Sequence, residues 1–345
     1  MAHFGLDIGS YAIKFVKAEG HDSHAKIKTV GSVYNSVGQI LPSDQNQFQQ
    51  LALLIKNGVK EFGLSGLNCH LSLPSNQAYM SIVQMPSLSD AELASAIKWE
   101  AEQHIPVALS EVNFEYDVIS RPPRNSSDET MSVFMVGAPK TVVDRYIQLL
   151  ETAGVEPTGL EPDVVSLART FQAQKDTKET ASKSTLVCHF GALNTTFLVT
   201  SESQLSVIHT ANIGSLALTR TIEKGLGLDP ARSEEYKRTY GLQENQLEGK
   251  VKTVLLPVFD ALVKEIRKTI QFYISQSPSN NNISRIIISG GGSNLPEMSS
   301  HLVDILSLEV IVGNPFENFS VDNNLKLPED LASYSIAVGL ATKAF

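Results

Sequence analysis

Residues 4–16 read FGLDIGSYAIKFV. An apolar strand carries the carboxylate of Asp7 near its end. Gly9 and the small hydroxyl of Ser10 follow it, and a second strand then carries Lys14. Because Gly9 lacks a Cβ, backbone N–H groups there can approach a phosphate, and a turn of such groups makes an anion nest. Asp7 is suited to Mg²⁺ held through water, and Lys14 adds a positive charge. The alternative for so short a stretch is an ordinary hairpin.

The same layout returns about 180 residues later. Residues 186–199 read LVCHFGALNTTFLV, again a strand, a polar residue, an apolar residue, glycine, a small residue and a second strand. Each copy is followed by a further β-rich stretch, at 25–34 and at 204–213. Since internal repeats fix an architecture, we expect two related domains that face each other across a cleft.

A third glycine loop follows a buried strand at 286–288. Residues 289–294 read SGGGSN, and Pro296 and Glu297 are predicted to open a helix through Ile305. A strand, a glycine loop and a helix N-terminus form a ready site for an anion or a nucleotide. A tight turn alone is the alternative, but it needs one glycine rather than three.

Composition narrows the class of protein. The 345 residues are 42% hydrophobic and carry a net charge of −9. This length can bury the cores of two or three domains, and the negative charge disfavours nucleic acid as a partner. We find no signal pattern and no apolar run near 18 residues, so we expect no membrane span. Cys69 and Cys188 are predicted to be reduced thiols in the cytoplasm.

A compact unit is predicted between residues 86 and 157. Ser89 and Glu92 form a capping box that starts a helix, and Pro106 stops it. Two strands are expected at 114–120 and 131–137, joined by a polar loop over 121–130, and a helix at 141–153 ends at Gly154. Outside the unit, helices are expected at 48–59, 162–174, 216–225, 230–240 and 246–276, strands at 69–73 and 79–85, and loops at 176–184 and 277–282.

These motifs, taken together and in this order, resemble the actin/Hsp70-like ATPases and, within them, the PilM family of type IV pilus assembly. The cell-division protein FtsA is the next nearest. The resemblance covers nearly the whole chain. It rests on the two phosphate-loop stretches and on AIKWEAEQHIPVALSEVNFEYDV (96–118), ANIGSLALTRTIEKGLGL (211–228), SEEYKRTYGL (233–242), EIRKTIQFYISQ (265–276), IIISGGGSNLPEM (286–298), VGNPF (312–316) and SYSIAVGLATKAF (333–345).

The resemblance implies an α/β, actin-like (ribonuclease H-like) duplicated fold. Two domains would surround a nucleotide cleft, with an FtsA/PilM-type inserted subdomain. The implied segments are 1–85 for the first domain (subdomain 1A), completed by 158–184 and 330–345; 86–157 for the inserted subdomain 1C; 185–220 and 283–329 for the second domain (subdomain 2A); and 221–282 for subdomain 2B.

The resemblance also implies ATP or ADP with Mg²⁺ between the three glycine loops. Asp7 would hold the metal through water. The residues it assigns to the nucleotide are Asp7, Gly9, Ser10, Lys14, His189, Gly191, Asn194, Thr195, Gly214, Ser215, Glu234, Lys237, Gly290, Gly291, Gly292 and Asn294. Glu234 and Lys237 lie three apart on one helix face. Without the resemblance they would be interpreted as a surface ion pair, which contributes little to stability.

Two positions depart from the family pattern. The family normally has Asp where this chain has His189, and imidazole is a poor Mg²⁺ ligand. Because phosphoryl transfer depends on positioning and charge, we expect nucleotide binding with weak or no hydrolysis, and no confident catalytic residue. Ser215 stands where a second glycine is common, and we expect it to offer its backbone N–H to the ligand.

A membrane partner is the further implication. The resemblance implies a cytoplasmic scaffold that lies at the inner membrane and binds the N-terminal tail of PilN. Pilus motor ATPases and a second copy of the chain are further candidate partners. Residues 86–120 carry Asp90, Glu92, Glu100, Glu102, Glu111, Glu115 and Asp117 against Lys98. Because cytoplasmic tails beside membrane helices are rich in Lys and Arg, this face would attract such a tail, with Glu100 and Glu102 as predicted contacts. A solvated helix face is the alternative.

Two other functions stay open on the sequence alone. One is an active ATPase or sugar-kinase-like enzyme of the same fold. The other is an FtsA-like component of cell division or secretion. Residues 341–345 are too short and too weakly amphipathic for the membrane helix of FtsA.

Overall fold

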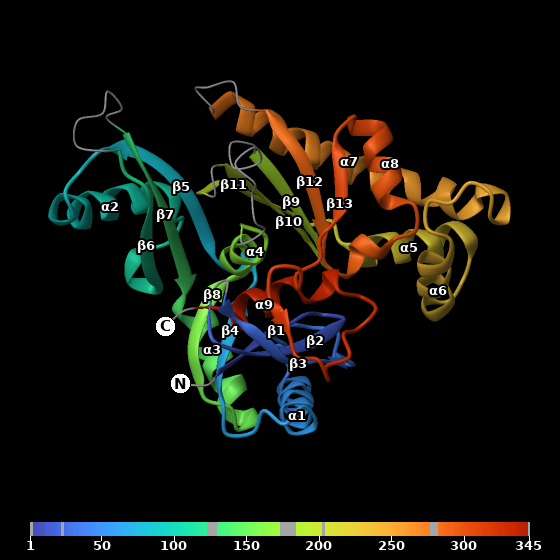
Figure 1. Ribbon diagram of the computed structural model, residues 1–345, viewed down its shortest axis with the longest axis horizontal. Coiled ribbons are helices and arrows are strands. Elements are labelled where there is room, and N and C mark those ends of the chain that lie inside the picture. The colour runs from blue at the N-terminus through green and yellow to red at the C-terminus, as the bar shows by residue number, and fades with distance from the viewer. Residues whose placement is uncertain are drawn as a thin grey trace.

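The computed structural model describes residues 3–21, 24–122, 130–172, 184–201, 204–276 and 282–343. The loops predicted near 121–130, 176–184 and 277–282 lie largely outside these ranges. Within these ranges the strands form three sheets, of six, five and three strands. Figure 1 shows the two larger sheets one above the other, with helices α4 and α9 between them and the smallest sheet to one side.

The six-stranded sheet has the order β14-β3-β2-β1-β4-β8. Strands β1, β2 and β3 form an antiparallel meander. Strand β4 pairs with β1 in parallel, and β8 pairs with β4 in parallel. Asp7 on β1 lies directly opposite Lys14 on β2, so the register joins the two charged residues of the first loop. The strands are β1 (His3–Ile8), β2 (Ala12–Glu19), β3 (Lys26–Tyr34), β4 (Asn68–Leu73), β8 (Pro157–Pro162) and β14 (Ser320–Val321).

The five-stranded sheet repeats this plan in the order β11-β10-β9-β12-β13. Again three strands form an antiparallel meander and two join in parallel, which confirms the duplication that the sequence predicts. His189 on β9 lies opposite Thr196 on β10. The strands are β9 (Ser184–Phe190), β10 (Thr195–Ser201), β11 (Gln204–Ala211), β12 (Ile283–Ser289) and β13 (Glu309–Val312).

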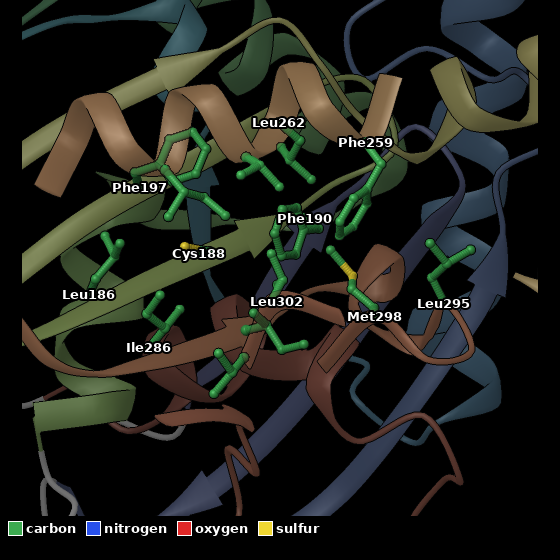
Figure 2. Packing of buried hydrophobic residues seen from close by; sticks show 14 of the residues in the cluster. Leu186, Cys188, Phe190, Phe197, Phe259, Leu262, Ile286, Leu295, Met298 and Leu302 are labelled. Atoms are coloured by element: carbon green, nitrogen blue, oxygen red, sulfur yellow. The ribbon is translucent and has the colours of Figure 1, made fainter. Parts of the chain in front are cut away.

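Helices cover both faces of each large sheet. Buried residues of the long helix α7 (Lys250–Gln276) pack on the second sheet, where Leu262 lies near Phe197 and Phe259 lies beside Phe190 (Figure 2). The other helices around the two larger sheets are α1 (Gln45–Glu61), α3 (Lys140–Ala153), α4 (Asp163–Gln172), α5 (Ser215–Leu226), α6 (Pro230–Tyr240), α8 (Met298–Leu306) and α9 (Ser335–Ala341). In the part of the chain that is described, no helix is long and apolar enough to cross a membrane.

The two helices between the sheets join the domains. Leu167 and Phe171 of α4 and Leu340 of α9 pack in one cluster with Val187 and Ile287 of the second sheet. Helix α9 also lies so close to β1 that a Cβ added at Gly5 would be 2.3 Å from a backbone oxygen of the helix. The absence of a side chain at Gly5 is therefore what allows α9 to seat on the first sheet.

The third sheet, in the order β5-β7-β6, forms the inserted unit with α2 across one face. The predicted capping box at Ser89 and Glu92 is confirmed, and Gly154 ends α3 in the left-handed conformation as expected. These elements are β5 (Tyr79–Pro86), α2 (Asp90–His104), β6 (Val112–Ser120) and β7 (Thr130–Pro139).

Two elements do not fit the boundaries expected for the inserted unit, at residues 86 and 157. Strand β5 lies almost wholly before residue 86 but belongs to the sheet of the unit, and α3 lies within 86–157 but packs with the first domain. Strand β5 pairs with β7 along its whole length, and α3 packs beside α1 on the first sheet. The domain boundaries themselves stay a prediction. The third glycine loop also differs from the expectation: Gly291–Asn294 form a 3-10 turn, Glu297 is left-handed, and α8 begins only at Met298.

Candidate functional site

A cleft of about 610 Å³ lies between the two domains. It is bounded by the first two glycine loops, α6, the 3-10 turn of the third loop and residues 328–336. All the predicted nucleotide residues line it except Thr195, Gly214 and Gly290. Those three shape the loops instead: the Thr195 hydroxyl donates to Ile213 O at 2.6 Å, and Cβ atoms at the two glycines would lie 2.4 Å from backbone oxygens.

The first loop holds a buried carboxylate beside a cation. Lys14 Nζ lies 3.1 Å from Asp7 Oδ2, and the Ser72 hydroxyl donates to Asp7 Oδ1 at 3.4 Å. Gly9 N–H donates to Ala12 O at 3.1 Å, where a Cβ at Gly9 would lie 2.8 Å from the same oxygen. The loop therefore requires glycine at position 9, and it presents one carboxylate and one ammonium to the cleft.

The second loop carries His189 with its imidazole buried. Its Nδ1 lies 3.1 Å from Ser289 Oγ on the neighbouring strand. The pKa of His189 is lowered to about 4, chiefly by burial; the Asp7 charge opposes the shift and the Lys14 charge contributes to it. The imidazole is therefore neutral at pH 7. A neutral ring stands where the family pattern has a carboxylate.

The expectation for Ser215 is wrong in one respect. Its backbone N–H donates to Gly191 O at 2.9 Å, and Gly191 N–H in turn donates to Asn194 O at 2.9 Å. The backbone N–H groups of Ser215 and Gly191 are thus both hydrogen-bonded within the hairpin and the first turn of α5. Ser215 still lines the cleft, but its N–H is already used within the fold.

Sequence reasoning missed a buried carboxylate of the cleft. Asp163, the first residue of α4, lines the cleft and is buried. It accepts the backbone N–H of Ser75 at 3.1 Å and also the Ser75 hydroxyl. Burial raises the pKa of Asp163 to about 6, and the charge of Asp7 contributes, although the bonds from Ser75 oppose the shift. Arg238 and Asp330 were missed as well: the Arg238 guanidinium lies 5.0 Å from the ring centre of Tyr11 across the cleft.

Helix α6 presents a tight ionic group. Lys237 Nζ lies 2.6 Å from Glu234 Oε2 and also donates to Thr219 Oγ1 at 3.0 Å, while Arg238 Nε lies 2.8 Å from Glu234 Oε1. Burial alone would raise the pKa of Glu234, but the bonds from Lys237, Thr219 and Arg238 bring it below its ordinary value. Lys237 is buried, so this pair is no surface ion pair.

The side chains that line the cleft fit a nucleotide bound with a hard divalent cation. Asp7 and Asp163 are oxygen ligands of the kind that Mg²⁺ prefers, and the metal usually keeps several waters. Lys14 can face phosphate. A Cβ added at Gly291 would meet only one atom within 4 Å, at 3.9 Å, so the cleft is open beside the third loop. The volume is within the usual range of ligand sites, about 300–1,000 Å³.

A second groove, of about 540 Å³, lies where the inserted sheet meets α3. It is partly apolar, through Leu41, Ala78, Tyr79, Pro139 and Val142. Its polar lining comes from Asn76, Gln77, Thr141 and Arg145.

Glu100 and Glu102, the predicted partner contacts, do not line this groove. Glu102 is exposed on α2. Glu100 Oε1 lies 3.2 Å from His104 Nε2, and His104 Nδ1 lies 3.3 Å from Ser81 Oγ on β5. Because Tyr79 of the groove lies on the same strand, Glu100 is near the groove's end of the unit. Their contact with a partner stays a prediction.

Duplicated sheets around a cleft lined by glycine loops define an actin-like ATPase fold. Two solved structures support this class. The ethanolamine utilization protein EutJ from Carboxydothermus hydrogenoformans aligns with a TM-score of 0.53 at 13% identity, over 99% of this chain and 89% of its own. MreB5 of Spiroplasma citri, solved with ADP, aligns with a TM-score of 0.51 at 12% identity, over 98% and 94%.

The particular family follows from the whole chain. The family model described as type IV pilus assembly protein PilM matches residues 5–345, and the chain belongs to this family. A solved PilM–PilN type IV pilus biogenesis complex contains a chain of similar fold, with a TM-score of 0.85 and 24% identity, over 98% of this chain and 97% of that one.

Proposed function

We propose that this chain is a cytoplasmic, nucleotide-binding scaffold of type IV pilus assembly that binds the N-terminal tail of the inner-membrane protein PilN. Membership of the PilM family supports the pilus role. The groove at α3 is the observation that carries the partner assignment, because it offers a short extended segment both apolar contacts and polar groups. Through the tail the scaffold is held at the inner membrane and links the motor side to the alignment subcomplex.

The groove and the acidic surface of α2 would recognise different parts of the tail. Among the residues that the structure describes, the groove lining includes Arg145 and no carboxylate. The Arg145 guanidinium is fixed by a bond to Pro42 O and lies 5.8 Å from the ring centre of Phe48. Apolar residues and backbone of the tail therefore fit the groove. Basic residues of the tail fit the acidic surface of α2, which steers their approach. Motor ATPases and a second copy of the chain are further proposed partners.

The nucleotide proposal rests on the cleft. ATP or ADP with Mg²⁺ would be held by Asp7, Lys14 and the glycine loops, with Glu234 and Lys237 at the nucleoside. When bound, Mg²⁺ neutralises phosphate charge. His189 presents a neutral ring to the cleft rather than a carboxylate, so this chain holds nucleotide without ordering an attacking water through that position. We propose little or no hydrolysis.

A groove-filling variant tests the partner assignment. The probe is a fluorescein-labelled peptide with the sequence of the PilN cytoplasmic tail from the same organism, and the readout is fluorescence anisotropy. Thr141→Trp places a large ring in the groove and should weaken binding at least about tenfold, since a buried contact of about 1.4 kcal/mol corresponds to a factor of ten. Thr152→Trp, on the exposed side of the same helix and outside the groove, should bind like the parent. Equal affinity of all three proteins would refute the groove as the tail site.

A further inference from the structure

Two tyrosines stand together at the mouth of the nucleotide cleft. Tyr11 belongs to the first glycine loop and lines the cleft, and Tyr34 is the last residue of β3, outside the cleft lining. Their rings meet edge to face with centres 5.4 Å apart, and the two side chains are 41% and 64% exposed. Both rings are therefore open to a contact from the opposite side of the cleft.

The backbone around the first glycine loop holds the Tyr11 ring in place. The buried residue Asn35 donates its backbone N–H to Tyr11 O at 2.9 Å and its side-chain amide to Gly9 O at 2.9 Å. Tyr34 lies opposite Ala12 in the ladder between β2 and β3. The loop and the end of β3 are thus tied together by protein groups, and the two rings need no ligand to hold their positions.

A cation reaches the pair from the other side of the cleft. Arg238 on α6 places its guanidinium 5.0 Å from the ring centre of Tyr11, within the range of a cation–π contact. Its Nε lies 2.8 Å from Glu234 Oε1, one turn earlier on the same helix. The guanidinium is therefore held between its own helix and the Tyr11 ring, and this contact spans the mouth of the cleft without a nucleotide.

A second contact crosses the mouth beside the first. Asn294 of the third glycine loop donates to Asp330 Oδ1 at 2.6 Å, and the next residue, Leu331, packs in the apolar cluster of the first sheet. Burial alone would lower the pKa of Arg238, but the bond to Glu234 raises it above its ordinary value, and the charge of Asp330 contributes. Asp330 is thus within electrostatic reach of Arg238, and the two contacts are neighbours.

We propose that Tyr11, Tyr34 and Arg238 form a clasp that closes the mouth of the cleft and sets how fast a nucleotide enters and leaves. The inference rests on the proposed binding of nucleotide in this cleft. Because the clasp joins protein groups only, it has to open before a nucleotide can enter and again before one can leave. Such a contact slows both steps by the same factor and leaves the equilibrium affinity nearly unchanged, whereas a side chain that binds the nucleotide directly slows departure alone.

Stopped-flow fluorescence with mant-ATP and Mg²⁺ measures both rates. Tyr11→Leu removes the ring that faces Arg238, so both rates should rise about fivefold, which corresponds to the loss of a contact of about 1 kcal/mol. Tyr34→Leu should raise both rates about twofold, because it removes only the support of the Tyr11 ring. In both variants Kd should stay within about twofold of the parent value, since entry and departure change together.

Two matched variants serve as controls. Tyr11→Phe keeps the ring and loses only the hydroxyl, so both rates should equal those of the parent. Tyr116→Leu removes a tyrosine of similar exposure, 38%, from β6 of the inserted unit, outside the cleft lining. It should also leave both rates unchanged.

Hydrogen exchange without nucleotide tests the clasp independently of any ligand. The reporter is the first glycine loop, where Gly9 N–H donates to Ala12 O. In Arg238→Gln the amides of residues 9–12 should exchange about threefold faster than in the parent, although the substitution lies across the cleft, because the loop loses its contact with α6. Exchange at the parent rate would show that Arg238 does not hold the loop, and the clasp would be overturned.

The outcomes separate the clasp from the function on which it rests. If mant-ATP does not bind the parent protein, the nucleotide proposal is refuted, and the clasp with it. If it binds, and both Tyr11→Leu and Tyr34→Leu exchange it at the parent rates, only the clasp is overturned. A rise in the dissociation rate alone, with weaker affinity, would make Tyr11 a direct contact of the nucleotide and would also overturn the clasp. Should Tyr11→Leu fail to fold, Tyr34→Leu and Arg238→Gln decide.

Discussion

The buried imidazole of His189 should make the folded state sensitive to acid. Its pKa is about 4 in the fold, because burial disfavours the charged ring, against an ordinary value of 6.5. The folded-state pKa is depressed, so the stability that this histidine contributes is complete above about pH 6.5 and is lost as pH falls toward 4. At pH 5.5 the unfolded chain holds the proton in roughly ten of eleven molecules and the folded chain holds almost none. This difference corresponds to a loss on the order of 1 kcal/mol relative to pH 8.

His189→Asn removes the titrating group. The assay is urea unfolding followed by circular dichroism at pH 8 and pH 5.5, without nucleotide. Between pH 8 and pH 5.5 the free energy of unfolding of the variant should fall by on the order of 1 kcal/mol less than that of the parent. Titration of Asp163 is common to both proteins and cancels in the comparison. Ser289→Ala keeps the ring buried while removing its hydrogen bond, so it should retain the parent's pH dependence. Equal losses in the parent and in His189→Asn would refute the assignment of a buried neutral ring.

Three further predictions concern function and one concerns the fold. Saturating ATP with Mg²⁺ should raise the melting temperature, and Asp7→Ala should abolish the shift; an unchanged melting curve in the parent would contradict the nucleotide proposal. His189→Asp should leave nucleotide affinity similar and raise turnover in a phosphate-release assay, whereas brisk turnover in the parent that Asp7→Ala removes would favour an enzyme. Tail binding should weaken with salt and in the Glu100→Lys, Glu102→Lys double variant, and salt-independent binding unaffected by the charge reversal would remove the electrostatic part of the proposal. Gly5→Ala should destabilise the fold by roughly 1–3 kcal/mol in urea unfolding, because its Cβ would lie 2.3 Å from a backbone oxygen of α9.

The sequence was informative where chemistry and local geometry coincide. Each of the first two glycine loops combines an apolar strand, a glycine and a small residue within a few positions, and both loops line the cleft as expected. Asp163 could not be found in this way. Its partner Ser75 is 88 residues away, and the two meet only because β8 pairs with β4 and brings the start of α4 beside the end of that strand.

The hydrogen-bond partner of the Ser215 N–H could not be predicted from the sequence either. Whether this donor faces a ligand or the Gly191 carbonyl depends on the distance between the hairpin and α5, and that distance is set by tertiary packing. The same holds for β5. Its apolar pattern predicts a strand, but its partner is β7, far along the chain, and local sequence does not specify it.

The seating of α9 and β14 on the first sheet has a consequence for biosynthesis. Strand β14 pairs with β3, and α9 packs on β1 with Phe316 and Tyr334 in the same cluster as Val16. The first sheet therefore cannot be completed until the ribosome has added residues roughly 300 positions later. At ordinary rates of synthesis this is a delay of about 15–60 s. During that interval the apolar face that α9 will cover is open to water, while the second domain emerges and can fold. We expect the N-terminal half of the nascent chain to depend on chaperones until the closing helix arrives.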